Sequence, residues 1–472
     1  MTVTTMGLSS TEMGFTRQLA QWIAESRRTW PDEAVNQAER GIVDTVACMI
    51  AGAGDEAAQR VAKGLSRWGA NGIVSRVGAV DGIDAPWAAL INGTATHALD
   101  YDDVLDPAAS HVSAVMVPAL LALGEEIDAS GAELVDAYIV GVEVQECLAE
   151  AVNMTHYTHG WHTTLTLGAP SAAAACARLL HLDAEQSRNA ISLATSMAAG
   201  FKRQFGTNAK PFHAGLGAKN GILAARMAAA GLTADPDVFE GPRGFLDLMV
   251  GADAAGFDTV LRRLDGPPAI VSPGVWLKRY PCCASTHRAV DGLIAMARTH
   301  NLAAADIARV ETLVSEPAVR NLMYVKPGDE MQARFSMPYC MAAAAHDKDL
   351  TLATFRRTAI GRADIAAFIP RVTMLPDPEQ PADMPSTVKS WATTTITTTG
   401  GMRFTSKVVD PKGYPDNPLS EPELAGKFRD CAEGQPAAVA SSYADWRSAA
   451  SAPKIRSLCA MLRGVAVANT GS

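Results

Sequence analysis

Apolar residues recur at helical spacing through the first half of the chain, from Ser9 to about Leu264. One stripe holds Phe15, Leu19 and Ile23, and spacing of three and four residues predicts amphipathic helices. Further helices are expected over residues 35–50, 86–99, 115–124, 131–152, 169–180, 183–199 and 217–230. Alanine and glycine fill many facing positions, so we expect these helices to pack closely as a bundle.

The pattern changes at the Gly-Pro-Pro sequence of residues 266–268. Apolar and polar residues then alternate over 307–315 and 367–374, as they do in strands. Residues 388–409 are rich in Thr, Val and Ile and contain Gly400-Gly401, which predicts a β-hairpin with a two-residue turn. Helical patterns over 286–300 and 337–346 lie between these strands.

Two more helical patterns follow Pro418, in SEPELAGKFRDCAE and APKIRSLCAMLRG, and we expect them to return to the bundle. We therefore predict a mainly α fold with two domains. Residues 1–268 and 410–472 would form a large all-helical bundle domain, and residues 269–409 a smaller α+β lid domain.

Composition narrows the class of protein. Of the 472 residues, 48% are apolar and 19% charged, which is enough to bury a large core. The net charge of −9 argues against a nucleic-acid partner. The eight cysteines show no paired metal-ligand spacing, which fits a reducing compartment. No secretory signal pattern is visible, and the most apolar run, 165–180, is too short to span a bilayer, so we expect a cytoplasmic protein without a membrane partner.

Four carboxylates crowd the loop that follows the helix expected over 86–99. They are Asp100, Asp102, Asp103 and Asp106, and His111 comes after them. Like charges this close repel one another, so the loop is either a solvated cap for the next helix or a site that needs a cation or a basic partner. Residues 102–106 also match DDxxD, with which helical prenyl-diphosphate enzymes hold Mg²⁺. We do not favour that function, because their second metal motif is missing and aromatic residues make up only 6%.

The segment HYTHGWH carries His156, His159 and His162 at intervals of three. Metal ligands, packed or surface histidines, and histidines for proton transfer or substrate binding are the possible readings. Gly160 weakens a helix here and no nearby carboxylate or cysteine completes a ligand set, so we favour proton transfer or substrate binding.

Two further motifs carry weaker signals. GLGAKNG, at residues 215–221, is similar to a dinucleotide-binding loop but lacks the third glycine and a preceding strand, so close helix packing is the better interpretation. Cys282-Cys283, followed by Ser285 and His287, is a possible nucleophile pair, although adjacent cysteines more often only pack.

Two lysines stand in special settings: Lys210 in FGTNAKPFHAG and Lys278 in WLKRYPCCASTH. A surface location is the default for a lysine. Together with Asp100, His111 and His162, however, they would make a site that holds carboxylates with cations and moves a proton. Proton abstraction next to a carboxylate needs both of these properties.

Eight segments, in order from about residue 40 to about residue 430, together resemble the MmgE/PrpD family. They are GIVDTVACMIAG, NGTATHALDYDD, HVSAVMVPALLALGE, GWHTTLTLGAPSAAAA, FGTNAKPFHAGLGAKNG, LKRYPCCASTH, ARFSMPY and YPDNPLSEPELAGKF. The family includes 2-methylcitrate dehydratase, cis-aconitate decarboxylase and iminodisuccinate epimerase. The resemblance implies a helical domain with an α+β lid and an active site between them. It also implies a homodimer, no metal and no organic cofactor.

The resemblance assigns roles to single residues. Asp100 matches the first aspartate of a D-x-D-D motif, and Tyr324 matches a lid tyrosine across a gap. In the epimerase branch, Tyr157 would be a second acid or base. The residues expected to act in catalysis are His111, His162, Lys210, Tyr157 and Asp100. The residues expected to bind substrate are Lys278, Tyr324, His97, Arg279 and His287.

Different motifs of the chain favour different branches of the family. Val104 stands where the dehydratase and decarboxylase branches tend to carry threonine, and Asp100 and His111 are one residue further apart than in the decarboxylase. HYTHGWH, KPFHAGLGAKNG and LMYVKP look more like the epimerase branch. We expect a lyase similar to 2-methylcitrate dehydratase that abstracts the α-proton of a small di- or tricarboxylate, with an epimerase of a small dicarboxylate as the alternative. A cis-aconitate decarboxylase and a non-catalytic carboxylate-binding relative rank lower.

Overall fold

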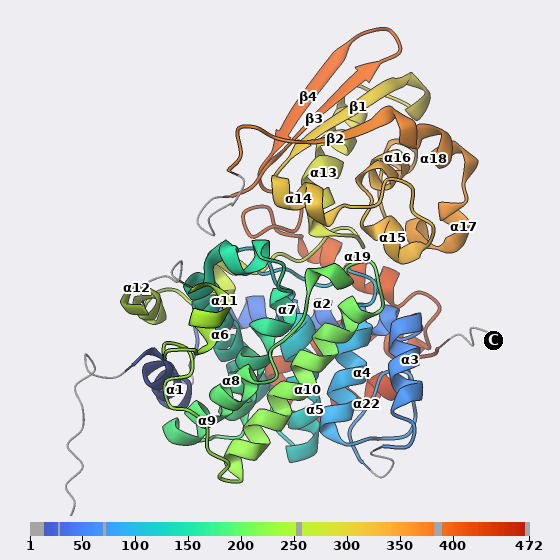
Figure 1. The fold of residues 1–472 in the computed structure, drawn as a ribbon. Helices are drawn as coiled ribbons and strands as arrows, with labels where there is room; N and C mark the ends of the chain where they lie inside the picture. Colours follow the sequence, from blue (N-terminus) through green and yellow to red (C-terminus); the bar gives the residue numbers. More distant parts are fainter. Residues whose placement is uncertain (1–13, 27–28, 69–71, 252–256, 382–388, 468–472) are drawn as a thin grey trace, which may run out of the picture.

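The structure, a computed structural model, describes residues 14–26, 29–68, 72–251, 257–381 and 389–467. Residues 9–13 of the expected helical region and Val388 of the expected hairpin lie outside these ranges. Figure 1 shows a helical part below and a smaller part with the sheet above. The mainly α fold with a small α+β part is therefore confirmed, whereas the domain boundaries at 268/269 and 409/410 stay a prediction. Within the described ranges, no helix has the length and apolarity that a membrane crossing requires.

The helical part contains most of the helices predicted from the apolar spacing. Its helices before the sheet are α1 (Phe15–Glu25), α2 (Asp32–Gly52), α3 (Glu56–Gly64), α4 (Ala85–His97), α5 (Val112–Ile127), α6 (Gly131–Thr158), α7 (Thr163–Thr166), α8 (Gly168–Leu179), α9 (Ala184–Thr195), α10 (Ala209–Ala229), α11 (Phe245–Met249) and α12 (Phe257–Arg262). Those after the sheet are α19 (Glu421–Cys431), α20 (Ala437–Ala440), α21 (Tyr443–Arg447) and α22 (Arg456–Arg463).

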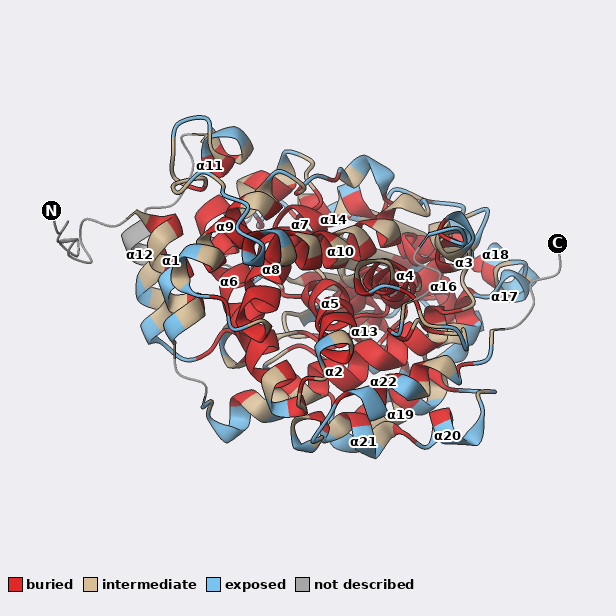
Figure 2. Cartoon of the chain, turned by 90° about the horizontal axis from the view of Figure 1, so that it is seen from below, coloured by how far each residue is buried: buried red, intermediate tan, exposed pale blue. Residues whose placement is uncertain are grey.

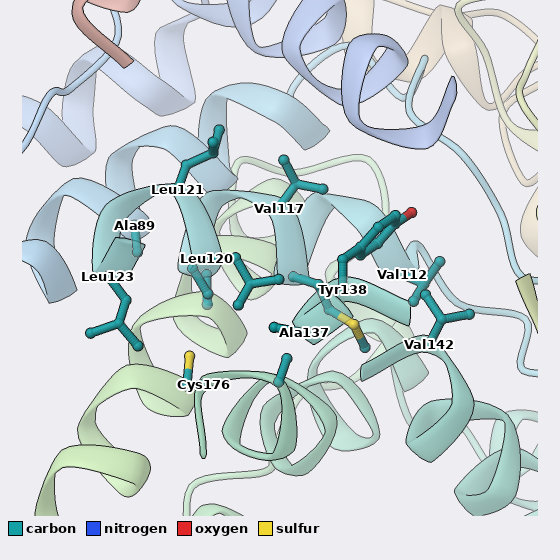
Figure 3. Packing of buried hydrophobic residues seen from close by; sticks show 14 of the residues in the cluster. Ala89, Val112, Val117, Leu120, Leu121, Leu123, Ala137, Tyr138, Val142 and Cys176 are labelled. Atoms are coloured by element: carbon teal, nitrogen blue, oxygen red, sulfur yellow. The ribbon is translucent and has the colours of Figure 1, made fainter. Parts of the chain in front are cut away.

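The core of this part lies around α5 and α6. Figure 3 shows Val117, Leu120 and Tyr138 packed together with Cys176 of α8. All four are essentially inaccessible to solvent, and Figure 2 shows the central helices buried on nearly all sides. Because burial of apolar surface is the main force that favours folding, these helices form a rigid base for the residues attached to their ends.

Small residues let α4 and α10 approach each other closely. A Cβ atom added to Gly93 would lie 2.9 Å from the Cα of Gly215, and one added to Gly215 would collide with the Leu90 carbonyl oxygen. The interpretation of GLGAKNG as a packing motif is therefore confirmed. The close approach also brings the first turn of α10 beside the last turn of α4.

We expect Gly215→Ala to lower the free energy of unfolding by about 1–3 kcal/mol, because the added methyl group meets backbone that cannot move aside. Gly426→Ala is the matched control. It lies inside α19 with no atom within 4 Å of the added Cβ, so it should raise stability by about 0.4–1 kcal/mol. Urea unfolding of both variants measures the difference, and equal stabilities would contradict the close packing of α4 on α10.

A buried acid on α6 makes stability depend on pH. Glu146 is 2% exposed, its Oε2 has no hydrogen-bond partner among the described residues, and burial raises its pKa to about 8. The unfolded chain releases this proton near pH 4.5, so between about pH 5 and pH 8 the folded chain binds more protons than the unfolded chain. Glu146 therefore lowers stability progressively as the pH rises through this window.

Glu146→Gln should be more stabilising at pH 8.5 than at pH 5.5, by about 3 kcal/mol, because glutamine does not titrate. Urea unfolding at the two pH values measures this difference. The exposed Glu185, replaced by glutamine in the same way, should show no such dependence on pH. A Glu146→Gln effect that is equal at both pH values would refute the account.

The α+β part consists of one sheet and the helices packed on it. Its strands are β1 (Ile307–Val314), β2 (Val372–Pro376), β3 (Ala392–Thr398) and β4 (Arg403–Val408), in the order β2-β1-β3-β4. Its helices are α13 (Ala284–Thr299), α14 (Glu316–Asn321), α15 (Glu330–Arg334), α16 (Met337–Asp347), α17 (Arg357–Ile360) and α18 (Ala363–Phe368). Strand β1 runs parallel to β2 and antiparallel to β3, with Val310 opposite both Val372 and Ile396.

Two local expectations for this part were wrong. Residues 367–371 are not strand: α18 and a 3₁₀ turn occupy them, because Ile365, Phe368 and Ile369 bury one helical face. The hairpin exists, but its turn is longer than two residues. The backbone N–H of Thr398 donates to the Met402 carbonyl, and only Gly401 of the glycine pair has a positive φ.

Candidate active site

The loop after α4 turns at Asp100, whose φ of 52° lies in the left-handed region that aspartate tolerates better than most residues. Asp100 is buried, and its Oδ1 accepts hydrogen bonds from Lys210 Nζ and Lys278 Nζ, each at 2.9 Å. Lys278 also donates to the Asp100 carbonyl at 2.8 Å. Lys210 comes from the first turn of α10, and Lys278 from the segment that leads into the α+β part. One carboxylate thus joins two buried ammonium groups.

A second carboxylate, Asp102, holds two histidines. Its oxygens lie 2.9 Å from His97 Nδ1, and His111 Nδ1 lies 3.1 Å from its Oδ2. His97 Nε2 lies 2.9 Å from Lys210 Nζ. An ammonium group only donates, so Nε2 of His97 accepts and its Nδ1 carries the proton toward Asp102. His97 therefore orients Lys210, which keeps one of its three N–H groups for a ligand.

Burial and neighbouring charges set the protonation states. Burial opposes ionisation of Asp100, but Lys210 and Lys278 outweigh it and hold the pKa of Asp100 well below its usual range. Burial lowers the pKa of His111 to about 3, and burial together with Lys210 lowers that of His162 well below its usual range. Both histidines are neutral near pH 7, so each ring carries one N–H group and one bare nitrogen.

The other two aspartates of the loop have different partners. Asp103 accepts hydrogen bonds from the backbone and hydroxyl of Ser113, and burial raises its pKa to about 7. Asp106 accepts from Arg288 at 3.3 Å and from the hydroxyl of Tyr414 at 3.1 Å. The carboxylates of the DDxxD match are thus divided among separate partners instead of facing one cation.

The three histidines of HYTHGWH do not share a site. His156 is buried, with its Nε2 2.7 Å from the hydroxyl of Thr166, and His159 is exposed. His162 is 1% exposed, its Nδ1 lies 2.8 Å from Nδ1 of His213, and its Nε2 has no partner among the described residues. A His162 that donates from Nδ1 would present a bare, basic Nε2, and the other tautomer would present an N–H donor.

A cavity lies where the two parts meet. Of the residues expected to act in catalysis, all five line it: Asp100, His111, Tyr157, His162 and Lys210. They come from the loop after α4, from the last turn of α6, from the start of α7 and from α10. The α+β part closes the cavity from the other side, with residues from α13, α14 and β3. The structure therefore brings together residues that lie more than 100 positions apart in the chain.

The residues expected to bind substrate are not brought to the cavity wall. His97 and Lys278 lie behind it, against Lys210 and Asp100. The other three lie elsewhere: Arg279 pairs with Asp349, His287 packs on Trp276, and Tyr324 lies against Gly206. Asn321, the last residue of α14 and three positions before Tyr324, does line the cavity.

Sequence reasoning missed several residues of this region. Lys427 of α19 is buried and lies 2.7 Å from Asp44, and it donates to the carbonyls of Tyr101 and Lys278. Its signal was a charge on the apolar face of a helix, beside Leu424 and Phe428, matched by Asp44 among apolar residues of α2. Lys202, with Nζ 3.6 Å from the centroid of the Tyr157 ring and a pKa that burial lowers to about 8, gave no such signal.

The types of side chain here could also hold a metal ion. One ligand atom from each of His97, Asp100, Asp102 and His111 lies within 4.8 Å of the others. Two ammonium groups already neutralise Asp100, and Nε2 of His97 faces one of them. The lysines therefore supply the positive charge that a divalent cation would supply, and the expected absence of a metal stays a prediction.

These observations define a mainly α protein with a smaller α+β part and a cavity between them that is lined by cations and neutral histidines. The chain belongs to the MmgE/PrpD family: residues 17–258 match the MmgE/PrpD N-terminal domain and residues 280–442 the MmgE/PrpD C-terminal domain.

Similar proteins include three named cis-aconitate decarboxylases. The one from Homo sapiens is 30% identical over 445 residues, which cover 90% of this chain and 87% of the relative. The one from Mus musculus is 27% identical over 411 residues, 84% of this chain and 82% of the relative. The one from Aspergillus terreus is 23% identical over 458 residues, 90% of each chain.

Proposed function

We propose that this protein is a cofactor-independent lyase that acts on a small di- or tricarboxylate by moving a proton at a carbon atom next to a carboxylate. The observation that carries the proposal is Asp100, which holds two buried ammonium groups beside neutral histidines at one cavity. Ligand carboxylates need cations, and a carbanion-like transition state needs both fixed positive charge and a nearby acid or base.

Each group at the cavity has a role in this proposal. Lys210 binds a substrate carboxylate with its remaining N–H and stabilises the negative charge that develops there in the transition state. His111 and His162 accept or return the proton, and Tyr157 is an additional proton donor. Lys278 and His97 position Asp100 and Lys210 from behind, so we expect activity to depend on them although they do not touch the substrate.

The named relatives change the order of the candidate reactions. The sequence alone favours dehydration over decarboxylation. Relatives that cover 90% of the chain are cis-aconitate decarboxylases, which favours decarboxylation. In that reaction the bond from carbon to one carboxylate breaks, CO₂ leaves, and the electron pair left on carbon takes a proton from one of the acids above. Cis-aconitate is therefore the first substrate to assay.

Dehydration is the second candidate, because it uses the same cations and proton-transfer groups. Val104 lines the cavity where both the dehydratase and the decarboxylase branches tend to carry threonine, so it does not separate the two reactions. In dehydration, a base removes the α-proton and the β-hydroxyl group leaves as water. Epimerisation, in which the proton returns to the opposite face, would use Tyr157 as the second group.

A product assay tests the proposal. The protein, treated with EDTA, is incubated separately with cis-aconitate, 2-methylcitrate and iminodisuccinate, and CO₂ release, alkene formation and loss of optical activity are recorded. CO₂ from cis-aconitate identifies the decarboxylase, and an alkene from 2-methylcitrate the dehydratase. Inactivity with all three acids, or activity that needs added metal, would contradict the proposal.

A further inference from the structure

The first turn of α13 faces the cavity from the α+β part. Ala284 is its first residue and Ser285 its second, both are half-buried, and both line the cavity. Arg288, one turn further along, lines the cavity from the same face of the helix. In Figure 1, α13 lies between the sheet and the helical part. One end of a 16-residue helix thus meets the ligand space from the part of the fold that does not carry Lys210.

This end of α13 offers a hydrogen-bond donor that has no partner. The first N–H groups of a helix have no acceptor within it, and the aligned peptide dipoles add partial positive charge there. No side chain caps this end, and the backbone N–H of Ala284 donates to no group among the described residues. Anions bind at helix ends of this kind, because both the N–H groups and the dipole favour negative charge.

Arg288 brings a full positive charge to the same place. Its Nε donates to the Val409 carbonyl at 2.8 Å, and its Nη2 donates to Asp106 at 3.3 Å. The ring centroids of Trp276 and Tyr414 lie 5.3 and 5.4 Å from its Cζ. These contacts fix a residue that is 8% exposed, whereas its Nη1 has no hydrogen-bond partner among the described residues and is not sealed from solvent. Nη1 is therefore free to bind an anionic group in the cavity.

We propose that the first turn of α13 and Arg288 form a second carboxylate subsite, which binds a different carboxylate of the substrate from the one that Lys210 holds. The inference rests on the proposed function in taking a small polycarboxylate as the ligand. A ligand bound at both subsites bridges the helical part and the α+β part, so the protein should select acids with at least two carboxylates. The subsite does not distinguish decarboxylation from dehydration, because the substrates of both reactions carry the carboxylates that it needs.

Calorimetry with propane-1,2,3-tricarboxylate tests the subsite without turnover, because this acid has neither a double bond nor a hydroxyl group to react. Arg288→Gln removes the charge and should raise the Kd of the tricarboxylate about 10- to 100-fold. Ala284→Pro removes one backbone donor and should raise this Kd about three- to tenfold. Proline is favoured at the first helical position, and Cys283, with φ −53° and ψ 130°, already has a conformation that can precede a proline, so the helix should stay intact.

Asp106→Asn separates ligand binding from a structural role of the ion pair. Asp106 also lines the cavity, and its charge repels an anion bound beside Arg288. Removing that charge should lower the Kd of the tricarboxylate about two- to fivefold. If Arg288 acted only by holding Asp106, the same substitution would instead raise the Kd, as Arg288→Gln does.

Arg298→Gln and Ala184→Pro are the matched controls. Arg298 is exposed in the last turn of α13, Ala184 is the first residue of α9, and neither lines the cavity. Both variants should bind the tricarboxylate within about twofold of wild type.

Unchanged affinity in Arg288→Gln or Ala284→Pro, weaker binding in Asp106→Asn, or no binding by the wild-type protein would overturn the inference. Ala284→Pro and Asp106→Asn leave the Arg288 side chain in place, so they decide the question even if Arg288→Gln fails to fold. Failure of the proposed lyase activity would appear separately, in the product assay.

Discussion

Lys210→Ala is expected to lower kcat by about a thousandfold or more while the protein stays folded. The lysine supplies the only cavity-lining ammonium group that Asp100 and His97 both hold, at 2.9 Å each, within the described residues. Removing it takes away the charge that binds a substrate carboxylate and stabilises the negative charge developing there. Steady-state kinetics on the substrate found in the product assay measure the effect, and circular dichroism checks the fold.

Lys219→Ala is the control for this change, because Lys219 lies on the same helix but stacks on Trp87 at 5.7 Å, away from the cavity. It should leave kcat within about twofold of wild type. If Lys210→Ala keeps more than about a tenth of wild-type turnover, Lys210 has no catalytic part.

Lys427→Met is expected to cost about 3–5 kcal/mol in the free energy of unfolding, because it leaves the Asp44 carboxylate buried without its cation. The change also removes the hydrogen bonds by which α19 holds the backbone at Tyr101 and Lys278. Urea unfolding measures the loss of stability.

A second substitution separates the charge from the packing. In the Lys427→Met background, Asp44→Asn removes the unpaired charge, so the double variant should recover about half of the lost stability. A single variant within about 1 kcal/mol of wild type would mean that this buried ion pair does not stabilise the fold.

The sequence was sufficient for the large features of the fold. Long helices such as α2 and α6 were predicted well, because a sustained apolar period of 3.6 residues leaves few alternatives. The short segment at 367–371 was not, because a few apolar residues fit a strand or one helical turn equally well. The order of the strands in the sheet, with β1 between β2 and β3, also depends on contacts that no local pattern encodes.

The residue types and the family resemblance were enough to predict which residues with catalytic chemistry line the cavity. They did not predict how these residues and their neighbours are arranged in space. Asp100, His111 and Lys210 were chosen for their chemistry, and they do line one cavity. That Lys278 lies behind Asp100, and that Asn321 lines the cavity while Tyr324 does not, depends on how the α+β part docks on the bundle. Such placement is a property of tertiary packing, so only the structure could give it.

The central claim is that the site around Asp100 moves a proton at a carbon atom next to a carboxylate without a metal. Proton NMR of the EDTA-treated protein in D₂O, with the substrate identified in the product assay, tests it most directly. For decarboxylation or epimerisation the account predicts deuterium at that carbon in the product with the wild-type protein; for dehydration it predicts loss of the α-proton signal as the alkene forms. Neither should exceed background with Lys210→Ala. Decarboxylation or epimerisation without deuterium at carbon, an alkene product that keeps the α-proton, or an equal reaction by the Lys210→Ala variant would contradict it.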